Sequence, residues 1–333
     1  MRLYLGFAVC FLLSFAFGRA AGAQTDYLTD GPYKVVEEMN PSLPNHTVYH
    51  PEDLSKVQGK LPLVAFGNGA CANAGNAFEN YLAEISSYGF LVVANGPINP
   101  AAPGRPPKPG QPFPPFPPGG RRGPALVQSK TTQLYESMDW AKAQNDDPAS
   151  PFHNKINLAA IAVSGQSCGG LQALEAASDP RVKTAVIFNS GIIRDPSSLP
   201  GGLAAATTTP PAGGAPSAAP PMPALILPGS VDSLKKLHSP IIYIIGGETD
   251  IAYKNAELDF GDINNVPLVN VNLTGVGHNG TLWQPYGGEF AKVATQWLLW
   301  QLRGDKKASA MFVDANCTLC TDPNWKVKTK NFH

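Results

Sequence analysis

The motif G-Q-S-C-G at residues 165–169 places Ser167 where a serine can act as a nucleophile. An apolar run typical of a buried strand, residues 158–163, precedes the motif, and apolar residues at helical spacing follow it. Strand, G-x-S-x-G and helix in this order predict a nucleophile elbow, a strained turn from which the hydroxyl projects alone. The turn is so crowded that only very small side chains fit two residues before and after the serine. The alternative is a glycine-rich turn with an idle serine.

A serine hydroxyl needs a base to take its proton, and the base needs an acid to orient it. Of the six histidines, only His278 follows a predicted strand at its carboxyl end, within a glycine-rich loop. A buried structural histidine is the alternative interpretation. Glu248 and Asp250 both follow the predicted strand at residues 239–245. Asp250 is the better candidate for the acid because a helix begins directly after it, and its alternative role is to cap that helix.

The order of these residues along the chain is also informative. Ser167, Asp250 and His278 follow one another as the triad residues of α/β-hydrolases do. Two further carboxylates, Asp259 and Asp262, lie beyond another helical turn.

Backbone N–H groups are the expected stabilisers of a negatively charged carbonyl oxygen. The N–H of Cys168 faces the nucleophile from the start of the following helix. A second N–H is expected from the glycine-rich loop at residues 67–71, where Asn68 and Gly69 are the candidates and an ordinary β–α turn is the alternative. The mechanism implies no metal and no organic cofactor.

Strands and helices must alternate to hold these residues. Strands are expected at residues 33–37, 47–49, 61–66, 90–94, 158–163, 182–188, 239–245 and, as the last strand, 266–273. Helices are expected at residues 76–87, 126–144 and 290–302, and after the serine motif. This alternation predicts a mostly parallel, doubly wound α/β sheet with helices on both faces. In such sheets the site lies at the carboxyl ends of the strands.

Two low-complexity insertions interrupt this pattern. Residues 97–124 contain twelve prolines, and residues 200–223 consist mainly of Pro, Gly, Ala, Ser and Thr without a charge. Both leave carboxyl ends of predicted strands, so they are placed to border the mouth of the site. The equally weighted alternative is a pair of tolerated, disordered surface insertions.

The start of the chain, residues 1–23, has the pattern of a secretory signal peptide cleaved before Gln24. The expected organisation is then an α/β domain at residues 24–304 and a C-terminal tail at residues 305–333. Loss of Arg2 and Arg19 changes the formal net charge from zero to −2. This charge suggests neither nucleic acid nor an anionic membrane as a partner, and no membrane anchor remains after cleavage.

Four cysteines remain in the secreted chain, an even number typical of an oxidising compartment. Cys71 and Cys168 flank the two loops that should share one oxyanion, so a disulfide between them is expected if their Cα atoms lie within about 7 Å. The alternative is a free buried thiol at Cys168. Cys317 and Cys320 then pair with each other, unless they bind zinc or bridge to another chain. Acceptor sequences for N-glycosylation, relevant in a eukaryotic host, begin at Asn45, Asn272, Asn279 and Asn316.

Together these motifs resemble secreted α/β-hydrolases of the dienelactone-hydrolase and cutinase-like polyesterase type. The resemblance runs from about residue 61 to residue 302 and rests on F-G-N-G, G-Q-S-C-G-G, E-T-D-I-A and G-V-G-H. It implies the α/β-hydrolase fold and hydrolysis of carboxylic esters. Polyesterases usually have an aromatic residue at the position of Asn68 and methionine at that of Cys168, which points away from a polyester substrate.

The sequence therefore predicts an extracellular serine esterase that acts on a small-molecule or polymeric ester. Ser167 attacks the acyl carbon, His278 transfers the proton, and Asp250 holds the imidazole tautomer. An acyltransferase with the same triad is one alternative. The other is a secreted binding or wall-associated protein built on an inactive hydrolase core.

Overall fold

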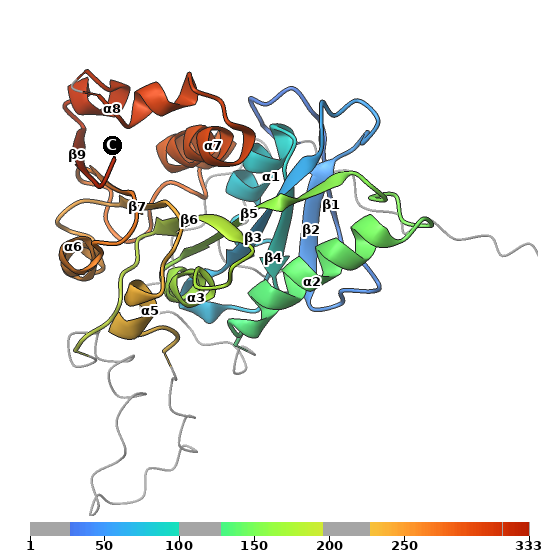
Figure 1. The fold of residues 1–333 in the computed structure, drawn as a ribbon, viewed down its shortest axis with the longest axis horizontal. Helices are drawn as coiled ribbons and strands as arrows, with labels where there is room; N and C mark the ends of the chain where they lie inside the picture. Colours follow the sequence, from blue (N-terminus) through green and yellow to red (C-terminus); the bar gives the residue numbers. More distant parts are fainter. Residues whose placement is uncertain (1–26, 100–127, 196–226, 315, 333) are drawn as a thin grey trace, which may run out of the picture.

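A nine-stranded sheet runs through the computed structural model, which describes residues 27–99, 128–195, 227–314 and 316–332 (Figure 1). The strand order is β1-β2-β4-β3-β5-β6-β7-β8-β9. The strands are β1 (Val35–Glu38), β2 (His46–Pro51), β3 (Leu61–Gly67), β4 (Leu91–Asn95), β5 (Ile156–Gln166), β6 (Val182–Phe188), β7 (Ile241–Ile245), β8 (Leu268–Leu273) and β9 (Trp325–Lys330). Strands β4, β3, β5, β6, β7 and β8 pair in parallel, and the outer strands pair antiparallel.

Helices pack on both faces of this sheet. One face carries α2 (Thr132–Asp146), α3 (Cys168–Ala176), α5 (Val231–Lys235) and α6 (Tyr253–Asp262). The other face carries α1 (Glu79–Ser87) and α7 (Gly288–Arg303). Shorter elements are η1 (Gly69–Cys71), η3 (Pro285–Gly287), η4 (Ala308–Met311) and α8 (Thr318–Thr321). The α/β class and the mostly parallel sheet expected from the sequence are confirmed.

The apolar strands form because both faces of the sheet are covered. All residues of β7 are buried, as expected for a parallel strand between two helical layers. In β5, Ile161 and Val163 pack into one hydrophobic cluster, whereas Ala160 and Ala162 pack into the other. Successive side chains of a strand point to opposite faces, so one strand contributes to both cores.

Helix α2 begins later than the sequence suggested. The expected start was residue 126, but Gln128 pairs with Ala72 in an isolated bridge and the N–H of Ser129 donates to the carbonyl of Cys71 at 2.8 Å. These backbone groups bind the loop after β3 and are not part of a helical turn. Helix α1 likewise begins at Glu79 rather than at residue 76.

The prediction that the strand at residues 266–273 is the last one is wrong. Strand β9 pairs with β8 along its length, from Leu268 opposite Lys330 to Leu273 opposite Trp325. Part of the expected tail therefore completes the sheet at its edge (Figure 1). The pattern W-K-V-K-T-K was not predicted as a strand because it has few apolar residues. Its alternate lysines are typical of an exposed edge strand, where they discourage pairing with other chains.

Several expectations concern residues outside the described ranges. These are the signal peptide at residues 1–23, the insertion at 200–223, and all but the first three residues of the insertion at 97–124. Across the described ranges, no helix combines the length and apolar character needed to cross a bilayer.

Candidate active site

Ser167 lies on the sharp turn between β5 and α3. Its backbone has φ 53° and ψ −117°, a conformation that residues other than glycine rarely adopt and that costs free energy. A Cβ atom on Gly165 would lie 2.2 Å from the carbonyl oxygen of Gly169, and one on Gly169 would lie 2.0 Å from that of Gly67. The crowding expected from the sequence is therefore present, and it requires glycine on both sides of the serine.

Three of the predicted site residues form one chain of hydrogen bonds. His278 Nε2 lies 2.9 Å from Ser167 Oγ, and His278 Nδ1 lies 2.7 Å from Asp250 Oδ1. The ionised carboxylate only accepts, so Nδ1–H donates to Asp250 and leaves Nε2 to accept the serine proton. The residues follow β5, β7 and β8, whose carboxyl ends meet at one edge of the sheet. This arrangement can remove a proton from the serine hydroxyl.

The carboxylate of Asp250 is fully buried and well supplied with donors. Besides His278, it accepts from Asn189 Nδ2 at 2.6 Å and from the N–H groups of Ala252 at 2.9 Å and Gly246 at 3.2 Å. Burial by itself raises the pKa of Asp250, but His278 and the other donors outweigh it, and the net pKa is lowered. The carboxylate is therefore ionised at neutral pH, where it can orient the His278 imidazole.

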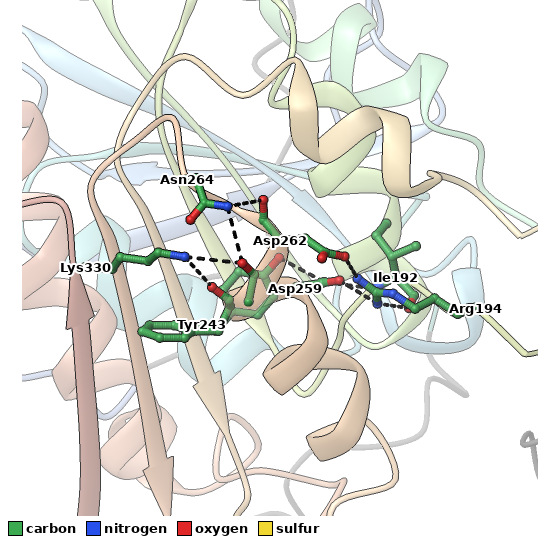
Figure 2. A network of polar contacts seen from close by, with 9 residues as sticks. Ile192, Arg194, Tyr243, Asp259, Asp262, Asn264 and Lys330 are labelled. Carbon is green, nitrogen blue, oxygen red and sulfur yellow. Dashed lines mark hydrogen bonds and ion pairs between the residues drawn. The ribbon is translucent and has the colours of Figure 1, made fainter.

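The other candidate acids face elsewhere. Glu248 is exposed and forms an ion pair with Lys326 at 2.8 Å. Asp259 and Asp262 belong to a separate network around Arg194 (Figure 2). The sequence favoured Asp250 over Glu248, and of the two only Asp250 lies within hydrogen-bond distance of His278.

Hydrogen bonds and ion pairs around Arg194 connect the segment after β6 with helix α6 (Figure 2). Buried Asp259 accepts from Arg194 Nη1 at 2.8 Å, from the Tyr243 hydroxyl at 3.0 Å and from the N–H of Ile192 at 2.9 Å. Arg194 also donates to the exposed Asp262 at 2.6 Å. Burial raises the pKa of Asp259 to about 6, against the opposing effect of its three donors. Helix α6 begins three residues after Asp250, so the network fixes the helix that directly follows this carboxylate.

We expect Arg194→Ala to destabilise the protein more at pH 8 than at pH 5. Loss of one partner of a buried ion pair costs roughly 3–5 kcal/mol when the other charge stays buried. A carboxyl with a raised pKa in the folded state stabilises the fold below its ordinary pKa of 3.8 and loses this contribution as the pH rises through about 6. At pH 5, Asp259 can therefore take up a proton and limit the loss. Urea unfolding of the wild type and the variant at both pH values measures the loss in the free energy of unfolding.

The matched control for this prediction is Lys235→Ala, because Lys235 pairs with Asp232 at the surface and both side chains are exposed. A surface pair of this kind contributes little, so a small loss is expected. Equal destabilisation by Arg194→Ala at both pH values would contradict the role assigned to Asp259.

The two expected oxyanion donors border the elbow. A Cβ atom on Gly169 would lie 2.6 Å from the backbone nitrogen of Asn68, so the loop after β3 lies directly against the serine turn. Cys168 is the first residue of α3, where an N–H has no partner within the helix. Among the described residues, neither the N–H of Asn68 nor that of Cys168 donates a hydrogen bond to another protein group. Both can bind an anionic oxygen.

The loop after β3 is strained. Ala70 and Cys71 have φ angles of 54° and 49°, in the left-handed region that favours glycine. The Asn68 side chain donates to the carbonyl oxygens of Ala72 at 3.1 Å and Asn95 at 2.6 Å, which closes the loop on itself and on β4. Such strain persists only where the surroundings over-determine the conformation.

The disulfide that the sequence favoured is present. Cys71 and Cys168 are bonded with their Cα atoms 5.1 Å apart, and Cys317 is bonded to Cys320. Cys168 lies directly after the serine, so the bridge joins the strained loop to the residue that carries one expected oxyanion donor. The two donors are thereby held close to a fixed separation.

We expect removal of the Cys71–Cys168 bridge to lower kcat more than it changes KM. Donors with a fixed separation need no rearrangement when charge develops on the oxygen, and this preorganisation is lost with the bridge. The bridge closes a loop of 97 residues, and removal of a native disulfide typically costs about 2–5 kcal/mol, with the larger values for long loops. Ester hydrolysis and thermal unfolding of the double variant Cys71→Ala/Cys168→Ala measure both effects.

The double variant Cys317→Ala/Cys320→Ala is the control, because it removes a disulfide of sequence separation 3. It should leave kcat unchanged. A Cys168 peptide recovered free and alkylated from the unreduced protein, or an unchanged kcat after removal of the first bridge, would refute the proposed coupling.

Three residues that support the site were not singled out from the sequence as supports. Asn189 follows β6 and binds Asp250, and its position at the carboxyl end of a parallel strand was a usable signal. Gln166 lies within the serine motif, but only tertiary contacts give it a role. Gln172 is buried in α3, where it donates to the Ser129 carbonyl at 2.9 Å and to Cys71 Sγ at 3.3 Å. No local pattern distinguishes Gln172 from a surface glutamine.

The glycosylation acceptors differ in accessibility. Asn272 is 2% exposed within β8, so the folded chain leaves no room there for a glycan. The three others, Asn45, Asn279 and Asn316, are exposed. In the part of the chain that the structure describes, no cluster of three or more His, Cys, Asp or Glu side chains is arranged to hold a metal ion.

The arrangement at the carboxyl ends of β5, β7 and β8 combines a serine hydroxyl, an imidazole and a buried carboxylate in hydrogen-bonded sequence. It lies beside two unpartnered backbone N–H groups in the described chain. No protein-family model and no curated protein matches this chain.

Proposed function

We propose that this protein is a secreted serine hydrolase with the α/β-hydrolase fold, and that it cleaves carboxylic esters through an acyl-enzyme. The observation that carries the proposal is the unbroken chain from Ser167 Oγ through His278 to Asp250. The strained elbow between a parallel strand and a helix supports it, as does the order Ser, Asp, His along the chain. The motif resemblance to secreted esterases points to the same reaction.

In the proposed reaction, Ser167 Oγ attacks the acyl carbon of the ester while His278 Nε2 takes the hydroxyl proton. The carbonyl oxygen becomes an oxyanion, which the N–H groups of Asn68 and Cys168 bind. When the tetrahedral intermediate collapses, the bond to the alcohol breaks and His278 returns the proton to the leaving oxygen. Water, deprotonated by the same nitrogen, then attacks the acyl-serine and releases the acid.

Asp250 has an electrostatic and orienting role in this scheme. It holds Nδ1–H, so that Nε2 faces the serine, and it stabilises the imidazolium that forms when the proton moves. It takes up no proton itself, which agrees with its lowered pKa. Asn189, Gly246 and Ala252 keep the carboxylate in place.

Labelling with a fluorophosphonate probe tests the proposal. We expect the native protein to be labelled at Ser167, and neither the heat-denatured protein nor Ser167→Ala to be labelled, because the probe requires an activated serine. A non-catalytic binding protein gives no labelling in any sample. Hydrolysis of p-nitrophenyl acetate with and without an added alcohol then separates an esterase from an acyltransferase, since only the transferase diverts the acyl group efficiently to the alcohol.

Secretion is tested separately. The pattern at residues 1–23 leads us to propose a mature protein that begins at Gln24 and is recovered from the culture medium. Amino-terminal sequencing of the secreted protein checks this start. An intact Met1 on the secreted protein would refute cleavage.

A further inference from the structure

The carboxamide of Gln166 lies between the two loops that flank the serine. Its Nε2 donates to the backbone carbonyl of His278 at 3.0 Å. Its Oε1 lies against Gly69, since a Cβ atom on that glycine would be 2.2 Å away from it. Gln166 is the last residue of β5 and is 6% exposed. One buried side chain, directly before the nucleophile, thus contacts both the histidine loop and the oxyanion loop.

We infer that Gln166 is a positioning residue that fixes the histidine loop and the oxyanion loop relative to Ser167. The inference rests on the proposed function, because it assigns Gln166 a role in the same reaction. Gln166 contacts no reacting atom in this scheme. It acts through the main chain of His278 on one side and through Gly69 on the other.

The histidine loop depends on such contacts because its own backbone is permissive. Gly275, Gly277 and Gly280 all have positive φ angles, of 80°, 73° and 59°. Glycine without a Cβ atom has a wide choice of conformations, so the loop needs external hydrogen bonds to hold one of them. Asn189 Nδ2 binds the carbonyl of Gly277 at 3.1 Å, and Gln166 binds the next carbonyl, that of His278.

The oxyanion loop depends on the same side chain for a different reason. The space next to the Cα atom of Gly69 is filled by the Gln166 carboxamide, and the nearest other side chain there is Phe78 at 3.8 Å from the Cβ position. Gly69 lies between Asn68, an expected oxyanion donor, and the strained pair Ala70 and Cys71. A shift of the carboxamide therefore reaches both the base and the oxyanion donor.

Glutamine fits this place by length and by chemistry. An amide donates to the His278 carbonyl, whereas an ionised carboxylate of the same shape would place an acceptor against an acceptor. Misplacement of a reacting group by about 1 Å can cost roughly 10²-fold in rate. We therefore expect Gln166→Ala to lower kcat between about 10-fold and 100-fold, with KM changed less than about twofold.

The first test compares Gln166→Ala with Gln166→Met, which keeps most of the volume and removes the donor. Both variants should lose kcat with little change in KM or in the melting temperature. The control is Gln58→Ala, because this glutamine is exposed and its backbone N–H donates to the Tyr33 hydroxyl. This variant should keep wild-type kinetics. A kcat within twofold of wild type for both Gln166 variants would overturn the inference.

A double-mutant cycle gives a sharper test. In Gly69→Ala the new methyl group must displace the Gln166 carboxamide, which is the flexible end of a side chain. The loss in kcat from Gly69→Ala should therefore be at least fivefold in the native background and largely absent in the Gln166→Ala background. Independent losses that multiply would show that Gly69 and Gln166 act separately, and would overturn the coupling.

The pH profile of Gln166→Glu separates positioning of the His278 loop from a merely structural role, which would give no pH dependence of the variant's relative kcat. A protonated carboxyl donates to the His278 carbonyl as the amide does, and an ionised one repels it. The ratio of variant to wild-type kcat should therefore rise as the pH falls, and a flat ratio would overturn the inference. Fluorophosphonate labelling of the wild type separates the two proposals, because a labelled wild type with unaffected Gln166 variants refutes only the positioning role, whereas an unlabelled wild type refutes the hydrolase itself.

Discussion

Ser167→Ala and His278→Ala are each expected to remove nearly all hydrolysis of p-nitrophenyl esters without unfolding the protein. Without Oγ no acyl-enzyme forms, and without Nε2 the hydroxyl keeps its proton, since these two atoms lie 2.9 Å apart and form one unit. Losses of about 10⁶-fold in kcat have been typical where such a unit is broken. The double variant should lose no more than either single variant. Initial rates with melting temperatures measure both points.

His153→Ala is the matched control for the histidine, because His153 precedes β5 at the amino end of the strand, away from the site. It should retain wild-type turnover. Full turnover of p-nitrophenyl acetate by Ser167→Ala would end the proposal. Losses that multiply in the double variant would mean that Ser167 and His278 do not act in one step.

Asp250→Asn is expected to lower kcat by roughly 10⁴-fold with the fold intact. The carboxamide can donate to Nδ1 of His278 and favour the tautomer with its proton on Nε2, so the nitrogen that faces Ser167 no longer accepts. Glu248→Gln is the control, because Glu248 is exposed and pairs with Lys326, and it should keep full activity. An inactive Glu248→Gln beside an active Asp250→Asn would move the acid assignment to Glu248 and leave the rest of the scheme standing.

Asp250→Asn should also change how the stability of the fold depends on pH in acidic solution. Because the pKa of Asp250 is lowered in the folded protein, its carboxylate contributes stability above the ordinary value of 3.8, and this is lost as the pH falls through the folded pKa. Thermal unfolding of the wild type and Asp250→Asn below pH 4 should therefore show a weaker pH dependence in the variant. Parallel curves would contradict the lowered pKa.

Local patterns were sufficient wherever the chemistry is local. The elbow follows from a buried strand, two glycines and a helix within a few residues, and the strand at Val182–Phe188 has the predicted bounds. The predictions failed where a segment gains its structure from a distant partner. Strand β9 has three lysines and little apolar character, and it forms because β8 presents an unpaired edge.

By itself, the sequence identified the residue types and the order of the candidate site: Ser167, then an acid for which Asp250 was favoured over Glu248, then His278. Each of them follows a predicted strand. The sequence also narrowed the cysteine pairing, because the loops that bear Cys71 and Cys168 had to border one oxyanion. These inferences depend on strand ends, which apolar runs and glycines mark clearly, and on the rule that parallel strands bring their carboxyl ends together.

The tertiary structure decided everything that depends on side-chain direction. Asp250 and Glu248 are two residues apart and chemically alike, but only Asp250 is buried toward His278, whereas Glu248 reaches Lys326 of β9. Gln166 and Gln172 acquire partners 112 and 101 residues away in the chain. A hydrogen bond requires heavy atoms within about 3 Å, and that separation depends on how all layers of the fold pack, which no local pattern encodes.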